Sequence, residues 1–246
     1  MEALDKMFRM IKKIYSYVLP NMRPLFLKRW YDNYLNDYAL KSYSQEGEDM
    51  ILRRIFENCT NGFYVDVGAH HPKRFSNTYF FYQKGWMGIN IEAMEGSREL
   101  FEKMRPRDIN IETAVSNRLE TLTYYIFNDT ALNGFSNDIS SRRDADSEYH
   151  IIRKKEMQTL TLAEILDKNL PENQSIDFLS IDVEGLEIKV LLSNNWEKYR
   201  PSIILVEVLN TSIEEISNNE IYSFLKAKGY FVLSKTVNTL IFKRID

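Results

Sequence analysis

Short apolar runs alternate with amphipathic segments along most of the chain. Runs rich in Val, Ile, Phe and Tyr predict strands that are buried on both faces, at 63–67, 87–91, 109–114, 176–181 and 202–208. Apolar residues at helical spacing predict helices at 47–58, 76–84, 95–104, 161–169, 186–194 and 218–227. Because strands that alternate with helices build a mostly parallel sheet, the pattern predicts an α/β fold.

The end of the chain departs from this alternation. The strand-like segments 230–234 and 239–244 are separated only by a short turn at 235–238, so they are expected to pair as an antiparallel hairpin. Together with the five earlier strands, they predict a mostly parallel seven-stranded sheet that ends in an antiparallel hairpin.

The central part and the N-terminus are less regular. An added strand is predicted at 121–127 and another near 156–160. The polar segment 128–150 shows no periodic pattern, so it is expected to be a long loop, either a lid or substrate loop or a partly disordered segment. Residues 1–40 are predicted to form an N-terminal helical extension, and 41–246 to form the main domain.

The composition limits the classes of partner. With 246 residues and 44% hydrophobic residues, the chain is long enough for one domain with a single core and an extension. A net charge of −3 and a pI near 5.8 argue against nucleic acid as the main partner, because proteins that bind phosphate backbones carry a concentrated basic excess. The single cysteine, Cys59, allows no intrachain disulfide and fits a reducing cytoplasm.

Residues 1–31 mix basic and aromatic side chains. They lack the apolar core of a signal peptide, and no apolar stretch approaches the ~18 residues that a membrane-spanning helix needs. Two interpretations of this segment remain open. It is either a helix packed on the domain or on another subunit of a homo-oligomer, or a helix that lies on an anionic membrane surface at the inner face of the membrane.

The first predicted strand ends in a pattern typical of ligand sites. The apolar run 63–67 contains Asp66 and is followed at once by Gly68, which permits a tight turn and close backbone approach. The second run, 87–91, ends at Glu92, at the distance from the glycine turn where an acid binds ribose hydroxyls in nucleotide-binding sheets. The phosphate-binding pattern G-x-G-x-x-G is absent, so a cofactor without phosphates, such as S-adenosylmethionine, is favoured.

Three further acids follow the predicted strands 176–181 and 202–208. Asp182 and Glu184 come after the first of these strands, and Glu207 ends the second. Carboxylates gathered at neighbouring strand ends repel one another unless protons or cations intervene, and hard oxygen ligands suit Mg²⁺ or another divalent cation. The three acids are therefore candidate metal ligands. Asp182 and Glu207, with His70 beside the glycine turn, are also candidate catalytic groups, because each can exchange a proton.

These features resemble the FkbM family of S-adenosylmethionine-dependent methyltransferases over residues 42–244. The resemblance rests on ordered blocks along the chain. The blocks are Tyr43-Ser44-Gln45-Glu46-Gly47-Glu48-Asp49, Val65-Asp66-Val67-Gly68-Ala69-His70-His71-Pro72, Phe75-Ser76-Asn77-Thr78, Lys84-Gly85-Trp86-Met87-Gly88-Ile89-Asn90-Ile91-Glu92, Arg105-Pro106-Arg107-Asp108-Ile109-Asn110, Leu160-Thr161-Leu162 and Ile181-Asp182-Val183-Glu184-Gly185-Leu186-Glu187. The residues after Glu92, Ala93 and Met94, depart from the proline-containing continuation that the family pattern implies.

The resemblance implies a Rossmann-like class I methyltransferase fold and transfer of a methyl group from the cofactor to a hydroxyl, often of a sugar or glycan. It also implies a set of cofactor contacts. Asp66, Gly68 and Ala69 would line the methionine end, Glu92 would hold the ribose, Ala114 and Val115 would face adenine, Gln45 and Asp49 would make further contacts, and Ser76 or Asn77 would reach the amino-acid end.

The mechanism expected from these residues is in-line displacement at the sulfonium methyl. Asp182 or His70 would take the proton of the acceptor hydroxyl, or a cation held by Asp182, Glu184 and Glu207 would lower the pKa of that hydroxyl. Two alternatives remain open. One is a methyltransferase for a lipid-linked or small-molecule hydroxyl at the membrane surface, and the other is a cofactor-binding scaffold without activity.

Overall fold

The computed structural model describes residues 10, 38–145 and 148–245, and the chain divides into two compact units, residues 1–42 and 43–246. The predicted helical extension, with its candidate membrane-contact segment, lies almost wholly outside the described residues and stays a prediction. Within the described ranges, no helix is long and apolar enough to cross a membrane.

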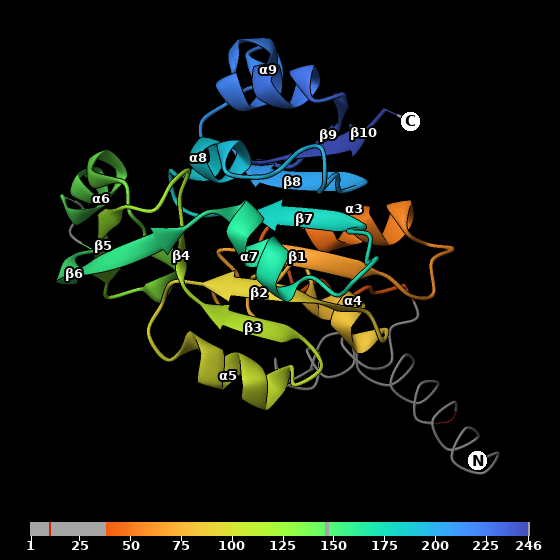
Figure 1. The fold of residues 1–246 in the computed structure, drawn as a ribbon. Coiled ribbons are helices and arrows are strands. Elements are labelled where there is room, and N and C mark those ends of the chain that lie inside the picture. Colours follow the sequence, from red (N-terminus) through yellow and green to blue (C-terminus); the bar gives the residue numbers. More distant parts are fainter. Residues whose placement is uncertain (1–9, 11–37, 146–147, 246) are drawn as a thin grey trace. The chain divides into compact units, whose positions relative to one another are not determined.

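The second unit is built on a seven-stranded sheet with the strand order β3-β2-β1-β7-β8-β10-β9 (Figure 1). Its strands are β1 (Phe63–Val67), β2 (Met87–Glu92), β3 (Ile109–Glu112), β7 (Phe178–Ile181), β8 (Ile203–Glu207), β9 (Tyr230–Lys235) and β10 (Thr239–Arg244). The pairs from β3 to β8 are parallel, whereas β10 is antiparallel to both of its neighbours. The predicted seven-stranded sheet with a closing hairpin is confirmed.

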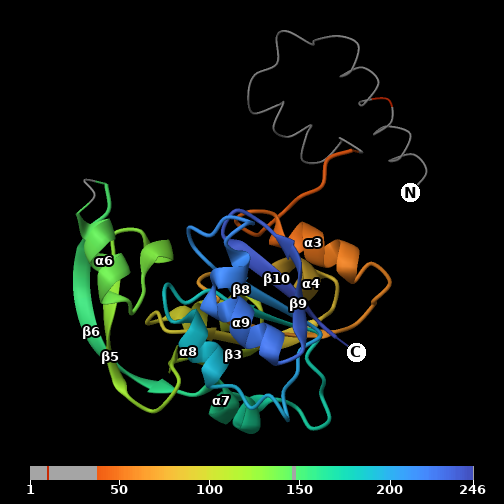
Figure 2. The same ribbon diagram turned by 90° about the horizontal axis from the view of Figure 1, so that it is seen from above.

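Helices cover both faces of this sheet (Figure 2). They are α3 (Glu48–Ile55), α4 (Tyr79–Gln83), α5 (Ser97–Met104), α7 (Leu162–Asn169), α8 (Glu187–Leu192) and α9 (Glu220–Ala227). The predicted start of α7 is confirmed by a capping box, in which the Thr161 hydroxyl accepts a hydrogen bond from Glu164 N while the Glu164 carboxylate accepts one from Thr161 N. Each predicted helix is present, although α4 is shorter than the segment 76–84.

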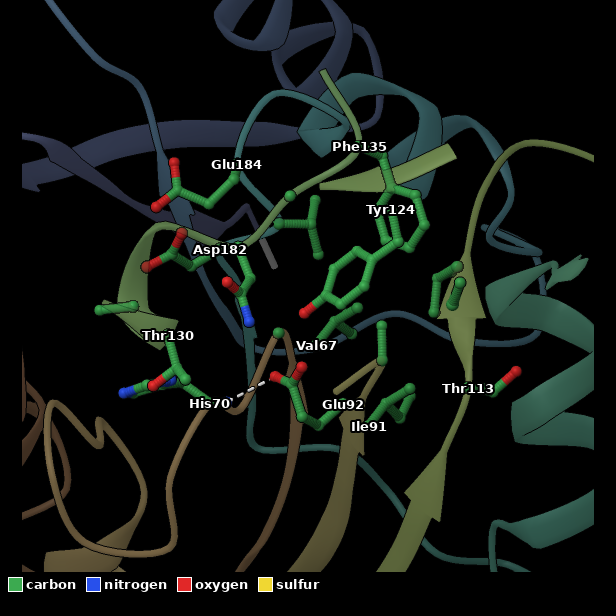
Figure 3. A pocket seen from close by; sticks show the side chains of 18 residues that line it. Val67, His70, Ile91, Glu92, Thr113, Tyr124, Thr130, Phe135, Asp182 and Glu184 are labelled. Carbon is green, nitrogen blue, oxygen red and sulfur yellow. Dashed lines mark hydrogen bonds between the residues drawn. The ribbon is translucent and has the colours of Figure 1, made fainter. Parts of the chain in front are cut away.

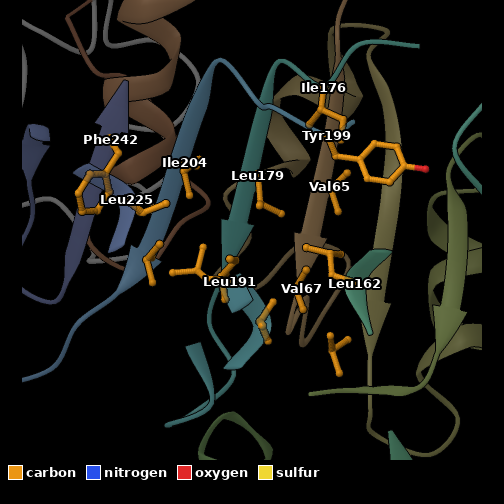
Figure 4. Close-up of a cluster of buried hydrophobic side chains, with 14 of the residues drawn as sticks. Val65, Val67, Leu162, Ile176, Leu179, Leu191, Tyr199, Ile204, Leu225 and Phe242 are labelled. Carbon is orange, nitrogen blue, oxygen red and sulfur yellow. The ribbon is translucent and has the colours of Figure 1, made fainter. Parts of the chain in front are cut away.

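Side chains of β1 alternate between two apolar clusters because successive strand residues point to opposite faces. On one face, Val65 and Val67 belong to the larger cluster, which includes Leu162 of α7, Leu191 of α8 and Leu225 of α9 (Figure 4). This cluster packs the three helices against one face of the sheet and so holds the central strands in place relative to one another.

The opposite face of the sheet is more aromatic. Tyr64 lies there in a cluster with Leu52 of α3, Phe81 of α4 and Phe178 of β7. The rings of Phe81 and Phe178 are 5.1 Å apart, and Trp86 packs against Phe81 at 4.8 Å. With both faces covered, the central strands are buried along their length, as their continuous apolar runs predict.

Two expectations for the central part were wrong. The strand predicted at 109–114 ends at Glu112, and the chain then forms β4 (Ala114–Val115) in a separate three-stranded sheet with the order β4-β6-β5. The segment 128–150, expected to be a long loop without regular elements, either a lid or substrate loop or partly disordered, contains a 3₁₀ helix, η1 (Thr130–Leu132), and the helix α6 (Asn137–Asp144).

The smaller sheet carries this segment beside the main sheet. Its outer strands are β4 and β5 (Thr121–Phe127), and its middle strand is β6 (Ile151–Leu160), which is longer than the predicted 156–160. The helix α6 begins at Ser136, whose hydroxyl accepts a hydrogen bond from Ile139 N. We call residues 128–144 the roof segment, because they pass over the carboxyl ends of the central strands.

A buried polar network ties β1 and β2 to the chain between α5 and β3. The guanidinium of Arg105 donates to Asp108 Oδ2 at 2.8 Å, to Tyr64 OH at 2.8 Å and to Thr78 Oγ1 at 2.9 Å. Thr78 in turn donates to Asp66 Oδ2 at 2.9 Å. Arg105 and Asp108 are fully buried, so each charge depends on the other for compensation.

Replacing Arg105 with Met should lower the free energy of unfolding by about 3–5 kcal/mol, because Asp108 would keep a buried charge without its partner. The control is Arg98→Met, which removes an exposed ion pair with Glu102 and should cost no more than about 1 kcal/mol. Urea unfolding of both variants measures the difference. Equal losses would show that the buried network does not support the fold.

Candidate active site

A cavity opens at the carboxyl ends of β1, β2 and β7, between the main sheet, the smaller sheet and the roof segment (Figure 3). It encloses about 570 Å³ of empty space, part of which is open to solvent. The residues that line it come from separate parts of the chain, including Gly68, His70, Glu92, Thr113, Ala114, Val115, Tyr124, Thr130, Phe135, Asp182 and Glu184. This position, outside the strand ends where the strand order reverses, is where open α/β sheets bind ligands.

Gly68 forms the floor of the cavity. Its φ of +80° lies in the left-handed region, and a Cβ atom placed there would stand 1.7 Å from the carbonyl oxygen of Asp182. Its backbone N–H donates to Ile91 O at 2.9 Å. Only glycine therefore lets the ends of β1, β2 and β7 approach this closely.

Glu92 is held in place by the backbone at the end of β2. One of its carboxylate oxygens accepts a hydrogen bond from His70 N at 2.7 Å, and the other accepts one from Met94 N at 2.8 Å. Burial raises the pKa of Glu92, and these backbone donors partly oppose the rise. Each oxygen keeps a further lone pair, so the fixed carboxylate can accept hydrogen bonds from hydroxyl groups in the cavity.

An apolar slot lies next to Glu92. Ala114 and Val115 line one part of it, and the rings of Tyr124 and Phe135 close another, with their centroids 4.7 Å apart. Burial raises the pKa of Tyr124, so its hydroxyl stays protonated. The apolar and aromatic side chains of the slot suit a flat, weakly polar ring.

The three predicted acids meet at the other end of the cavity. Carboxylate oxygens of Asp182, Glu184 and Glu207 lie within 4.8 Å of one another. Burial, followed by the nearby charge of Glu207, raises the pKa of Asp182 well above its usual range. Burial, followed by the charges of Glu184 and Glu187, raises the pKa of Glu207 to about 8. Near neutral pH, Glu207 therefore holds a proton that an ordinary glutamate would release.

The donor set of this cluster fits a divalent cation, since Mg²⁺ and Ca²⁺ prefer carboxylate oxygens. One of the three acids is already engaged, because Arg143 of α6 donates to Glu184 Oε2 at 2.7 Å. Arg143 and a cation would compete for the same carboxylate.

His70 lines the cavity next to the glycine turn. Burial, followed by the nearby charge of Arg74, lowers the pKa of His70 to about 4, so the imidazole is neutral at pH 7. Its Nε2 atom is buried without a hydrogen-bond partner. A neutral imidazole of this kind is a weak base but retains the capacity to hydrogen-bond a ligand.

A second cavity adjoins the first, and Asp182 lines both. The second cavity includes Gln45 and Asn77, two of the predicted cofactor contacts, together with Glu207 and Asn238. The Nδ2 atom of Asn77 donates to Ser180 Oγ at 3.1 Å, which fixes the amide beside the end of β7. Asp182, after β7, thus lies beside both cavities, and Glu207, at the end of β8, lies beside the second.

Comparison with known proteins decides the family. The model of the methyltransferase FkbM domain matches residues 66–232, which is most of the second unit. The chain belongs to the FkbM methyltransferase family. The match includes Gly68, Glu92 and Asp182, which line the first cavity, and Glu207, which lines the second. Among curated proteins, no sequence match was found.

Solved structures with a similar fold are distant in sequence. One is a putative O-methyltransferase from Klebsiella pneumoniae, with 10% identity, 96% of each chain covered and a TM-score of 0.43. A putative RNA methyltransferase from Pyrococcus horikoshii shares 10% identity, with 91% of this chain and all of the other covered and a TM-score of 0.42. The glycopeptide N-methyltransferase MtfA, solved with sinefungin, has 10% identity, 91% and 98% coverage and a TM-score of 0.36.

The side chains of two residues predicted to touch the cofactor make local hydrogen bonds near the start of the second unit instead. Asp49 is fully buried and accepts hydrogen bonds from Tyr43 N at 3.0 Å and from Ser44 Oγ at 2.9 Å. Ser76 Oγ accepts a hydrogen bond from Tyr79 N at 3.0 Å at the start of α4. Neither side chain lines the two cavities.

Asp66 and Ala69, also predicted at the cofactor's methionine end, lie beneath the cavity floor. The Asp66 side chain points into the buried network through Thr78, and burial raises the pKa of Asp66. Ala69 is buried and its N–H donates to Ile91 O at 3.1 Å. The structure separates these supporting residues from Gly68, which reaches the cavity directly.

The roof segment contributes to the site, as the lid or substrate-loop interpretation of 128–150 expected, but the residues through which it does so were not predicted. Two ion pairs join the roof segment to the rest of the site. Arg143 pairs with Glu184 at 2.7 Å, and Asp129 pairs with Arg74 at 3.6 Å. A Cβ atom on Gly134 would lie 2.7 Å from Glu184 Cβ, so the roof segment packs closely on the chain after β7. The Ser136 cap was the available signal for α6, but it lay inside a segment without helical periodicity.

Gly68→Ala should abolish binding of S-adenosylhomocysteine, the product form of the expected cofactor, because the added methyl group would collide with Asp182 O. The matched control is Gly85→Ala. Gly85 has a φ of +96° with no atom within 4 Å of the added Cβ, so this variant pays only the backbone strain, about 1 kcal/mol, and should bind normally. Calorimetric titration of both folded variants separates strain from collision. Normal binding by Gly68→Ala would refute the close approach.

Glu207→Gln should stabilise the protein at pH 8 relative to wild type but have little effect at pH 5. Because the folded-state pKa of Glu207 lies above that of an unfolded glutamate, its protonated form contributes stability that is lost as pH rises through about 8. The expected difference between the two pH values is about 1–3 kcal/mol. Denaturant unfolding at each pH measures it.

The control for this measurement is Glu215→Gln. The backbone N–H of Ser212 lowers the pKa of Glu215, so this group titrates below pH 5 and its replacement should have the same effect at both pH values. A pH-independent effect of Glu207→Gln would contradict the proton held in the acid cluster.

Proposed function

We propose that this FkbM domain is an S-adenosylmethionine-dependent O-methyltransferase. The observation that carries the proposal is the fixed carboxylate of Glu92, which stands between the Gly68 turn and the apolar slot. This arrangement offers hydrogen-bond acceptors to ribose hydroxyls and, beside them, a slot for an adenine ring. The absence of a phosphate-binding glycine pattern favours this cofactor over a dinucleotide.

The cofactor would lie across the ends of β2, β1 and β7. Adenine would occupy the slot formed by Ala114, Val115, Tyr124 and Phe135, and the ribose would meet Glu92. The sulfonium would come above the Gly68 turn, where the acids of the cluster favour its positive charge. The amino-acid end would extend toward the inner part of the second cavity, to the amide of Asn77.

In the proposed reaction, the acceptor oxygen attacks the methyl carbon in line with the sulfonium sulfur. A C–O bond forms, the C–S bond breaks, and S-adenosylhomocysteine leaves with the electron pair of that bond. Most of the rate enhancement would come from holding the three atoms in line. The acceptor's proton passes to the Asp182 and Glu207 pair once one of its two carboxyls has ionised. Asp182 lines both cavities and Glu207 lines the second, and the pKa of Glu207, about 8, places this ionisation close to neutral pH. His70, a much weaker base, would orient the ligand instead.

A divalent cation at Asp182, Glu184 and Glu207 would supply a Lewis acid that lowers the pKa of a hydroxyl bound to it. The donor set supports such a site, and Arg143 supplies a positive charge to Glu184 in its place.

We further propose that the acceptor is a hydroxyl of a sugar or glycan and that the enzyme works in the cytoplasm. The second cavity supports a hydroxyl-bearing acceptor, since amide and carboxylate groups predominate among its polar side chains. The same carboxylates disfavour nucleic acid, because they would repel phosphate groups.

Glu92→Gln should weaken S-adenosylhomocysteine binding by about 10-fold to 100-fold, the effect of removing charged hydrogen-bond acceptors worth about 1.5–3 kcal/mol. The control is Glu95→Gln on the same loop. Glu95 is exposed and pairs with Arg153 and Lys155, so the control should bind as wild type does.

Asp182→Asn should retain affinity for S-adenosylhomocysteine within a few-fold, since this change preserves side-chain shape while removing the proton acceptor.

Calorimetric titration of the purified full chain measures all three affinities. No binding by folded wild-type protein would overturn the proposed cofactor. Equal affinity in Glu92→Gln and Glu95→Gln would remove Glu92 from the site.

A further inference from the structure

Phe75 is an exposed aromatic side chain at the rim of the second cavity. It is 40% exposed and lines that cavity together with Gln45, Asn77 and Glu207. Its φ of +55° is in the left-handed region, which a bulky residue rarely adopts and which costs on the order of 1–3 kcal/mol. The fold therefore holds a large apolar ring in a strained conformation without burying it.

Neighbouring side chains fix the orientation of this ring. His70 stacks on it with an interplanar angle of 23° and a centroid distance of 6.4 Å. The guanidinium of Arg74 lies 4.4 Å from the ring centroid, and Arg74 also pairs with Asp129 of the roof segment. Two side chains of its own loop thus hold the ring, and one of them is tied to the roof segment, which limits the motion of the ring as a binding platform requires.

Polar groups that suit sugar hydroxyls lie across the same cavity. Asn238 donates through Nδ2 to Glu46 Oε1 at 2.7 Å and through its backbone N to Glu46 Oε2 at 2.8 Å. These bonds hold the Asn238 amide by its nitrogen and leave Oδ1 to accept a hydrogen bond. The amide of Gln45 adds a donor and an acceptor, and Glu207 connects this side to the acid cluster.

We propose that Phe75, Asn238 and Gln45 form the acceptor subsite and that it takes a carbohydrate ring stacked on Phe75. The C–H face of a pyranose would cover the aromatic ring, while its hydroxyls would meet the two amides. One hydroxyl would then point to the Asp182 and Glu207 pair, beside the methyl group. This inference rests on the proposed function, because it assigns the acceptor of that same reaction.

The polar side chains of the second cavity favour a sugar over an aliphatic alcohol. An aliphatic alcohol would leave the amides of Gln45 and Asn238 without hydrogen-bond partners, which costs binding energy. A pyranose has both an apolar C–H face for the ring of Phe75 and hydroxyls for the amides of Gln45 and Asn238.

The test uses saturation-transfer NMR on the full chain saturated with S-adenosylhomocysteine, with the methyl glycosides of glucose, galactose and mannose as probes. At least one glycoside should receive saturation at its ring protons. Phe75→Ala should reduce that transfer at least 5-fold, whereas Phe75→Trp should retain it, because stacking on an aromatic ring contributes about 0.5–1.5 kcal/mol or more. The control is Phe231→Ala, which removes a similarly exposed ring, 43% exposed, from β9.

Phe75→Gly distinguishes binding from a structural role. Glycine adopts the left-handed conformation without strain, so this variant should be as stable as wild type or more so and should still lose the glycoside. A marked loss of stability in Phe75→Gly, or unchanged transfer in Phe75→Ala, would overturn the subsite. Absence of transfer to every glycoside in wild-type protein with the cofactor product bound would also overturn it while leaving the proposed methyl transfer intact. Failure to bind S-adenosylhomocysteine would instead count against the proposed function itself.

Discussion

The whole site depends on the close approach of two backbone segments at the ends of β1 and β7. Gly68 lies against the carbonyl oxygen of Asp182 so tightly that a methyl group would stand 1.7 Å from it. β2 and β3 lie on one side of β1 in the sheet, and β7 and β8 lie on the other, so the strand order reverses at this contact. The contact therefore sets Glu92 on one side and the acid cluster on the other, with the proposed position of the sulfonium between them.

Electrostatics connects the acid cluster to the roof segment. Asp182, Glu184 and Glu207 are brought together with little solvent, and burial raises the pKa of each. Arg143 neutralises part of this charge and in the same contact holds α6 over the cavity. Removal of water strengthens both effects, because charges interact more strongly in a less polar surrounding. The ion pair between Arg143 and Glu184, which holds α6 over the first cavity, thus also affects the proton affinity of the proposed base.

The sequence pattern predicted the residues at the strand ends that line the cavity, but not the roles of several residues elsewhere in the same sequence blocks. Gly68, Glu92 and Asp182 were expected to meet because the carboxyl ends of parallel strands share one edge of a sheet, and they do meet. Asp49, Asp66 and Ser76 belong to the same sequence blocks, yet their side chains turn into buried hydrogen-bond networks. The α6 helix was not expected because it has no apolar face, and its contacts with Glu184 and Gly185 come from residues about 40 positions away in sequence.

The sequence by itself determined the order of strands and helices, the closing hairpin and the choice of a nucleoside-type site. Local periodicity, the capping residues and the single glycine turn carry that information, since each acts within a few residues of itself. Only the tertiary structure decided which acids face a cavity, where the roof segment lies and which protons the acid cluster keeps. Those properties depend on burial and on distances between segments remote in sequence, which no local pattern records.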